Sequence, residues 1–182
     1  MKNCLCTALV LSLMTAGTVS AQSWAPAGDR IRTAWAEEVT PENVHKEYPR
    51  PQMVRPDWKS LNGLWEYSIT PKNAVVPERF DGQILVPFAV ESSLSGVGRT
   101  FTPEDALWYR TTFRVPSAWK GKRLLLNFEA VDWQADVIVN DVQVGRHTGG
   151  YTHFSFDITP YLKSGDNTLV VRVEDSTDND FQ

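Results

Sequence analysis

Cysteine is almost absent from this sequence. The 182 residues contain two cysteines, Cys4 and Cys6, and both lie within the first six positions. The disulfide framework that holds many small secreted domains together is therefore excluded for the rest of the chain. Any fold beyond this segment must be stabilised by its own hydrophobic core, which a chain of this length can build.

Long apolar runs are also missing. The apolar stretch Leu5–Met14 is shorter than the roughly 20 residues that a helix needs to span a bilayer. It follows Lys2 and precedes Val19-Ser20-Ala21, a small-residue cleavage site. These features predict a secretory signal peptide over residues 1–21 and an exported protein, periplasmic or extracellular. An uncleaved anchor is the alternative.

A strong charge of either sign is missing as well. The chain has 18 basic and 22 acidic residues, a net charge of −4, and no basic run. Lys2 is the only charged residue in 1–21, so cleavage makes the remaining chain slightly more acidic. This composition argues against partners such as nucleic acid or an anionic membrane.

Motifs for catalysis or metal binding are not found either. The three histidines, His45, His147 and His153, lack the close spacing of a metal site. The segment 91–96 lacks a Gly-x-Ser-x-Gly elbow, and no glycine-rich phosphate loop occurs. The acidic pair Asp132 and Asp136 is typical of solvated acids at strand ends. The sequence therefore predicts no catalytic residue, no metal and no cofactor in this chain.

Most of the chain after residue 57 consists of short apolar-rich runs broken by turn residues, the pattern of successive β-strands. About eight strands and no long helix predict an all-β fold, a jelly-roll-type antiparallel β-sandwich. Asn140-Asp141 is expected to form a two-residue hairpin turn. The expected strands cover residues 65–69, 83–86, 107–115, 123–128, 134–140, 142–146, 154–158 and 168–174, with short helical turns at 117–119 and 159–162. Alternation along them predicts that the core includes Phe113, Leu126, Val137, Val139 and Val171.

The segment before the first strand is polar and dotted with proline. We expect residues 22–56 to form an extended arm that lies across the domain, anchored by Trp24, Trp35 and Tyr48. A disordered linker is the alternative, although three large aromatic residues weigh against it. The predicted organisation continues with a β-sandwich domain over 57–178 and the start of a connection to further domains over 179–182.

Several motifs resemble one family in their order and spacing. The matching pieces are Leu61-Asn62-Gly63-Leu64-Trp65, Val86-Pro87-Phe88, Trp108-Tyr109-Arg110, Phe128-Glu129-Ala130-Val131, Val137-Ile138-Val139-Asn140, Gly149-Gly150-Tyr151 and Phe156-Asp157-Ile158-Thr159-Pro160-Tyr161-Leu162. From about residue 47 to 176 the chain resembles the N-terminal sugar-binding domain of family 2 glycoside hydrolases, the β-galactosidase, β-glucuronidase and β-mannosidase group.

The resemblance implies that catalysis and the accessory role belong to different domains of one polypeptide. In the family this jelly roll precedes an immunoglobulin-like domain and a (β/α)₈ barrel, and the barrel carries the acid/base and nucleophile glutamates of a retaining hydrolysis. The 182 residues hold no such barrel. The resemblance therefore implies an accessory domain that contacts those two domains within one polypeptide and contacts carbohydrate.

Two stretches are candidates for contact with sugar. The first lies in the long loop 88–105 and contributes Glu91 and Ser92, since long ordered loops are often functional. Ala89 stands where a β-galactosidase of the family offers an asparagine to substrate. The second stretch, Asp132-Trp133-Gln134, combines an indole with polar groups, which suits the C–H face and hydroxyl edge of a sugar. His147, just before the Gly149-Gly150 bend, completes the candidates, although a structural histidine is the alternative.

Three functions remain open at this point. The leading prediction is an accessory domain of an exported glycoside hydrolase. The second is a free-standing carbohydrate-binding module, which the high tryptophan content of seven residues also fits. The third is a β-sandwich that serves in adhesion or assembly and binds no sugar.

Overall fold

The computed structural model describes residues 24–29 and 31–176, so the expected signal peptide and residues 179–182 lie outside the described residues. The described part contains eight strands and five short 3-10 helices. The strands are β1 (Gly63–Pro71), β2 (Gly82–Val86), β3 (Asp105–Arg114), β4 (Leu125–Phe128), β5 (Gln134–Val139), β6 (Val142–Thr148), β7 (Phe154–Asp157) and β8 (Asp166–Glu174). The helices are η1 (Ala34–Glu38), η2 (Pro51–Met53), η3 (Ser93–Ser95), η4 (Ser117–Trp119) and η5 (Thr159–Tyr161). None of these helices could cross a membrane, being too short and not apolar enough.

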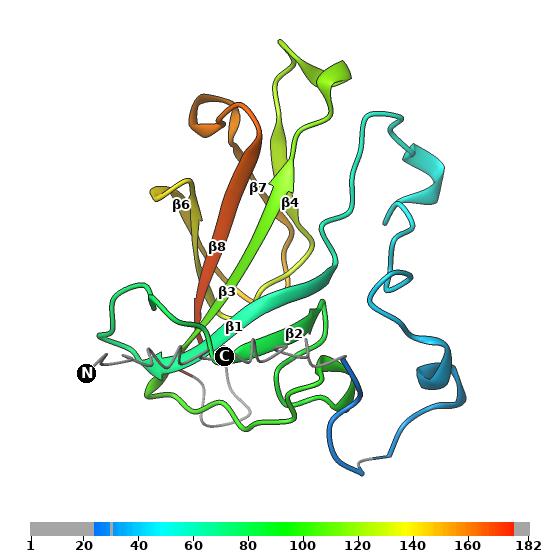
Figure 1. The fold of residues 1–182 in the computed structure, drawn as a ribbon, viewed down its shortest axis with the longest axis vertical. Helices are drawn as coiled ribbons and strands as arrows, with labels where there is room; N and C mark the ends of the chain where they lie inside the picture. The colour runs from blue at the N-terminus through cyan, green and yellow to red at the C-terminus, as the bar shows by residue number, and fades with distance from the viewer. Residues whose placement is uncertain (1–23, 30, 177–182) are drawn as a thin grey trace, which may run out of the picture.

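The strands form two antiparallel sheets, which confirms the predicted all-β sandwich. The large sheet has six strands in the order β2-β1-β3-β8-β5-β6, and the small sheet consists of β4 and β7 (Figure 1). The long strands β3 and β8 lie side by side at the centre of the large sheet. Neighbours such as β3 and β8 are far apart in sequence, so the sheet is held together by long-range pairing.

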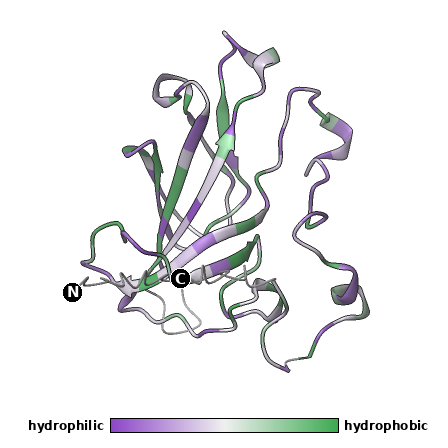
Figure 2. Ribbon diagram, viewed as in Figure 1, coloured by the Kyte–Doolittle hydropathy of each residue, from purple (hydrophilic) through white to green (hydrophobic). Residues whose placement is uncertain are grey.

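The hydrophobic core lies between the two sheets. Alternate side chains along each strand point toward it, and the hydrophobic segments in Figure 2 recur along the strands. The five residues predicted for the core are all buried, with exposures between 0% and 8%. They are Phe113, Leu126, Val137, Val139 and Val171.

The hairpin between β5 and β6 turns at the two predicted residues. Asn140 and Asp141 have φ angles of 49° and 68°, the left-handed conformation that a type I′ turn requires at both positions. The buried Asn140 side chain also donates to the Tyr161 carbonyl and to Asn167 Oδ1, both at 2.8 Å. Its Oδ1 accepts from the Thr168 backbone N–H, so one side chain joins this turn to the start of β8.

The outer face of the large sheet carries a polar network. The expectation that Asp136 is a solvated acid is wrong, because it is only 5% exposed. Its carboxylate accepts hydrogen bonds from Arg146 Nε at 2.5 Å and Gln143 Nε2 at 2.9 Å. Arg172 pairs with the same carboxylate at 3.4 Å and lies over the Trp108 ring. Because each charge has an opposite charge beside it, this face tolerates a buried carboxylate.

Several strand ends differ from the sequence-based expectation. β3 begins at Asp105 rather than at residue 107, because Ala106 and Asp105 pair with Thr70 and Pro71 of β1. β4 begins at Leu125 rather than at residue 123. Strand pairing across the sheet decides these ends, and a single-strand periodicity does not contain that information.

The arm before β1 runs along one side of the sandwich, in blue and cyan in Figure 1. Trp24 packs against Gly96, and Tyr48 meets Trp58 edge to face with ring centroids 5.1 Å apart. The prediction that Trp35 anchors the arm is wrong, because its side chain is 74% exposed. Trp35 lies in η1, where no described element covers it.

Candidate functional site

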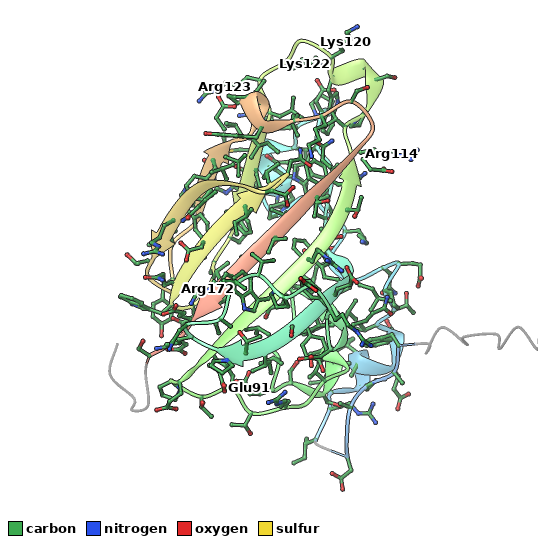
Figure 3. All side chains as sticks on the ribbon, turned by 60° about the vertical axis from the view of Figure 1, so that its left-hand side comes forward. Glu91, Arg114, Lys120, Lys122, Arg123 and Arg172 are labelled. Carbon is green, nitrogen blue, oxygen red and sulfur yellow. The ribbon has the colours of Figure 1, made fainter. Side chains whose placement is uncertain are left out.

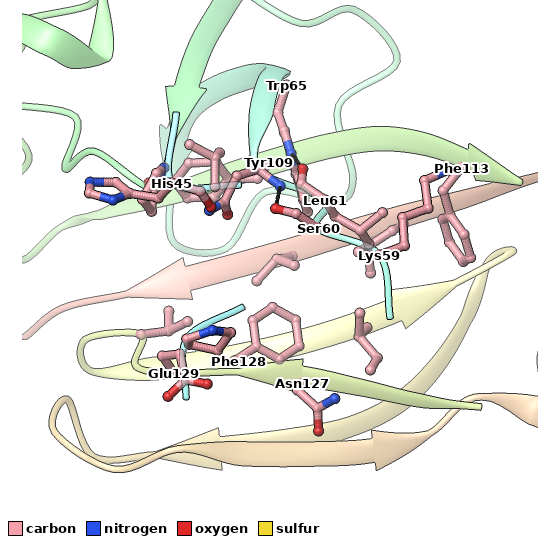
Figure 4. A pocket seen from close by; sticks show the side chains of 18 of the residues that line it. His45, Lys59, Ser60, Leu61, Trp65, Tyr109, Phe113, Asn127, Phe128 and Glu129 are labelled. Atoms are coloured by element: carbon pink, nitrogen blue, oxygen red, sulfur yellow. Dashed lines mark hydrogen bonds between the residues drawn. The ribbon is translucent and has the colours of Figure 1, made fainter. Parts of the chain in front are cut away.

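A cavity of about 990 Å³ opens between the two sheets. Its walls are core side chains: Tyr109 and Phe113 of β3 lie on one side and Phe128 of β4 on the other (Figure 4). Val171 of β8 and Leu126 of β4 also line it. We call this cavity the intersheet groove.

Glu91 lines one end of the intersheet groove. It lies in the loop after β2 and is half-buried. Burial raises the pKa of the Tyr109 phenol, and the negative charge of Glu91 raises it further. The phenol therefore stays protonated at neutral pH and is able to donate a hydrogen bond.

Ser92 has a structural role in the same loop. Its hydroxyl donates to the Ala89 carbonyl at 2.7 Å and accepts from the Ser95 N–H at 3.2 Å, which caps η3. Ser92 does not line the intersheet groove. Its predicted contact with sugar therefore has no support in the geometry, and it stays a prediction.

Asp132, Trp133 and Gln134 form the start of β5 and the turn before it. The Trp133 backbone is held on both sides, since its N–H donates to Glu174 and its carbonyl accepts from Gly149 at 2.8 Å. The Asp132 carboxylate lies so close to Gly150 that a β-carbon at that position would overlap it. Trp133 is 38% exposed.

His147 lies in β6, directly across from Ala135 of β5. Its ring stacks on Phe154 with centroids 4.1 Å apart and an interplanar angle of 14°. Its Nε2 is 3.3 Å from the Thr152 hydroxyl. These contacts give His147 a packing role, and its predicted contact with sugar stays untested.

The structure brings the two predicted stretches to the same end of the sandwich. Glu91 and Asp132 both line the intersheet groove, whereas Trp133, Gln134 and His147 lie outside its lining. Further acidic residues that line the groove include Glu129 and Asp175, which sequence reasoning did not select. In the sequence, Glu129 directly follows β4 and Asp175 directly follows β8, and this position after a strand is the feature that could have identified them.

These carboxylates are oxygen acceptors suited to ligand hydroxyl groups or to cationic side chains. Among residues 24–29 and 31–176, no group of three or more His, Cys, Asp or Glu side chains could hold a metal ion.

Comparisons with known proteins agree on one family. Residues 97–181 match the family described as "Glycosyl hydrolase 2 galactose-binding domain-like". A "Beta-galactosidase" of Thermoanaerobacter pseudethanolicus is 45% identical over 76 residues, which is 41% of this chain and 10% of that protein. A "Beta-glucuronidase" of Paenibacillus borealis is 31% identical over 132 residues, 69% of this chain and 22% of that protein. The chain thus spans less than a quarter of the length of these relatives.

The solved structure of a Lactobacillus rhamnosus "Beta-glucuronidase" is similar to this chain in fold. The TM-score is 0.50 at 31% sequence identity, and the match covers 63% of this chain and 20% of that one. The similarity is again confined to a small part of a much longer protein.

Proposed function

We propose that this chain is the N-terminal accessory domain of a longer, exported β-glycoside hydrolase, because residues 97–181 match the family described as "Glycosyl hydrolase 2 galactose-binding domain-like". The observation that carries the proposal is that Glu91 and Asp132, from separate loops, line one end of the intersheet groove. The partly exposed Trp133 follows Asp132 directly. Carboxylates beside an indole are the groups that recognise a sugar ring.

Catalysis itself belongs to a different domain in this proposal. A retaining glycosidase needs two carboxyl groups about 5 Å apart across the scissile bond, one as acid/base and one as nucleophile. The accessory domain supports the catalytic domain and contributes the Glu91 loop to one side of the substrate cleft. The names of the similar proteins favour a β-galactoside or a β-glucuronide as substrate.

A free-standing carbohydrate-binding module is the second candidate. It is favoured by the exposed aromatic side chains Trp133 and Tyr151, which are 38% and 83% exposed. Exposed aromatic rings near polar groups are able to stack on sugar rings without help from another domain.

Titration of the 182-residue chain with oligosaccharides separates the two candidates. We expect an accessory domain to bind galactose- and glucuronate-containing oligosaccharides weakly, with a Kd above about 1 mM. Micromolar binding that is lost in Trp133→Ala, but kept in Trp35→Ala, would instead establish the binding module. Trp35 is a suitable control because it is exposed and lies in the arm.

A further inference from the structure

The loop that carries Glu91 is held together by a buried serine. The hydroxyl of Ser95, a residue with 0% exposure, lies 3.1 Å from the Val90 carbonyl and 2.7 Å from the Ser92 carbonyl. These two carbonyls belong to the residues on either side of Glu91 in the chain. The same hydroxyl accepts a hydrogen bond from the Val97 N–H at 3.0 Å. Ser95 therefore fixes the backbone both before and after Glu91.

Residues 24–27 of the arm bind this loop from outside, and we call them the strap. The Ala27 N–H donates to the Ser93 carbonyl at 2.8 Å, and the Ser93 hydroxyl donates to the Ala27 carbonyl at 2.6 Å. Because Ser93 is only 7% exposed, these bonds are shielded from competing water. Figure 3 shows the labelled Glu91 at the lower end of the molecule, and the arm, in pale blue, passes the same end.

The strap lies so close to the loop that two glycines are needed beneath it. A β-carbon at Gly96 would lie 2.8 Å from the Trp24 indole, and one at Gly98 would lie 3.0 Å from the Ala27 β-carbon. Both distances are shorter than the roughly 3.5–4.0 Å of an ordinary contact between carbon atoms. The strap therefore packs directly on the backbone of the loop.

A later part of the arm contacts the loop on the other side of Glu91. The rings of His45 and Phe88 have centroids 6.2 Å apart. His45 is itself held to the sandwich, because Asn62 Nδ2 donates to its carbonyl at 2.9 Å. The arm thus meets the loop both before and after Glu91, while the stretch around the exposed Trp35 lies between these two contacts.

We propose that the strap is a positioning element that holds the Glu91 loop in the conformation in which Glu91 lines the intersheet groove. Its consequence for turnover rests on the proposed function, in which Glu91 contacts a substrate hydroxyl. A carboxylate orients a hydroxyl only from a fixed position, and a displacement on the order of 1 Å is enough to impair turnover. Trp24 and Ser93 are therefore positioning residues that act through Glu91.

Amide hydrogen exchange in the 182-residue chain tests whether the strap holds the loop. Trp24→Ala removes the indole and leaves the loop sequence unchanged. We expect the Ser95 and Val97 amides to exchange about tenfold faster in this variant. Both amides are hydrogen-bonded within the loop, so faster exchange reports opening of the loop itself. The Val171 amide of β8 is the control for global unfolding, and unchanged exchange at Ser95 and Val97 would overturn the inference.

The close approach at Gly96 has a matched control elsewhere in the chain. Gly96 and Gly121 have φ angles of 81° and 80°, but no described atom beyond its chain neighbours lies within 4 Å of a β-carbon at Gly121. Gly96→Ala and Gly121→Ala therefore introduce similar backbone strain, and only Gly96→Ala displaces the Trp24 indole. We expect Gly96→Ala to lower Tm more than Gly121→Ala, and this difference to disappear in a Trp24→Ala background. Equal Tm losses in the parent chain would contradict the close packing of the strap.

Turnover in the longer enzyme of the proposed function tests whether the strap acts through Glu91. At equal folded fraction, Trp24→Ala is expected to lower kcat/KM about tenfold. The double variant with Glu91→Gln should be no slower than Glu91→Gln alone, because the strap then has no carboxylate to position. Losses that multiply in the double variant would overturn the inference. Unchanged kinetics in Glu91→Gln would count against the proposed function alone, since the exchange rates do not depend on activity.

Discussion

Adjacent residues of β4 differ sharply in burial, and this difference is a residue-scale test of the fold. Leu126 is 7% exposed and faces the core, whereas Leu125 is 49% exposed. We expect Leu126→Ala to lower the free energy of unfolding by about 2–5 kcal/mol, because it leaves a cavity among packed side chains. Leu125→Ala is the matched control, with an expected change within about 0.5 kcal/mol. Urea denaturation measures both, and equal effects would contradict the strand phase.

Glu91 gives a second residue-scale prediction, made for the longer enzyme of the proposed function. If its carboxylate orients a substrate hydroxyl, Glu91→Gln removes a charged hydrogen bond, at a cost of roughly 1.5–3 kcal/mol. That is about a tenfold to hundredfold decrease in kcat/KM, with Tm nearly unchanged. Glu78→Gln, in an exposed loop away from the groove, is the control. Unchanged kinetics for Glu91→Gln would leave this loop with a structural role only.

Among the elements, the β5–β6 turn combines two residues with different roles. Asp141 has a φ of 68°, so glycine at this position relieves a backbone conformation that costs an L-residue roughly 1–2 kcal/mol. We expect Asp141→Gly to raise stability by up to about 1 kcal/mol once the entropy of glycine is included. Asn140→Gly should instead lower stability by about 1–3 kcal/mol, because it removes the buried hydrogen bonds to Tyr161 and Asn167. Thermal denaturation distinguishes them, and a loss of stability in both variants would contradict this assignment of roles.

The junction between β7 and η5 is expected to make stability depend on pH in acid. Hydrogen bonds from Thr159, followed by one from Arg123, lower the pKa of Asp157 to about 2. The ordinary value is about 3.9, so the folded state favours the carboxylate. The stability that the Asp157 carboxylate gives to the folded state is therefore fully present above about pH 3.9 and is lost as the pH falls toward 2.

The corresponding variant is Asp157→Asn. We expect the free energy of unfolding of this variant to depend less steeply on pH between about 4 and 2 than that of the parent chain. Thr159→Val should shift acid unfolding of the chain to higher pH. It removes the Thr159 hydroxyl, whose hydrogen bond is the largest cause of the lowered pKa of Asp157. Urea denaturation at several pH values measures both effects. An Asp157→Asn variant with the parent's slope would contradict the prediction.

At the scale of the whole molecule, the proposed division between domains predicts an inactive chain. The 182 residues are expected to release no nitrophenol from β-galactoside or β-glucuronide substrates above the buffer blank, since the catalytic carboxylates of the proposal belong to another domain. Glu91→Gln and Glu129→Gln are the controls for contaminating activity. Turnover that disappears in either variant would place catalysis in this chain and contradict the proposal.

The fold could be predicted from the sequence to a large extent, because the signals that define it are local. Alternation of apolar residues with a period of two identified the core positions Leu126, Val137 and Val171, and all three are buried. The Asn140-Asp141 pair identified its turn, because few residues adopt positive φ. The start of β3 differs from the expectation, since pairing with β1 decides it.

The candidate site depended on tertiary structure. Glu91 follows β2 and Asp132 precedes β5, and they share the intersheet groove only because of the strand order β2-β1-β3-β8-β5. Glu129 and Asp175 join them for the same reason, and the exposure of Trp35 likewise follows from what the arm leaves uncovered. The sequence by itself determined which residues face the core, since periodicity along one strand is local. Only the tertiary structure decided which acids line one groove, because that depends on the order of strands distant in sequence.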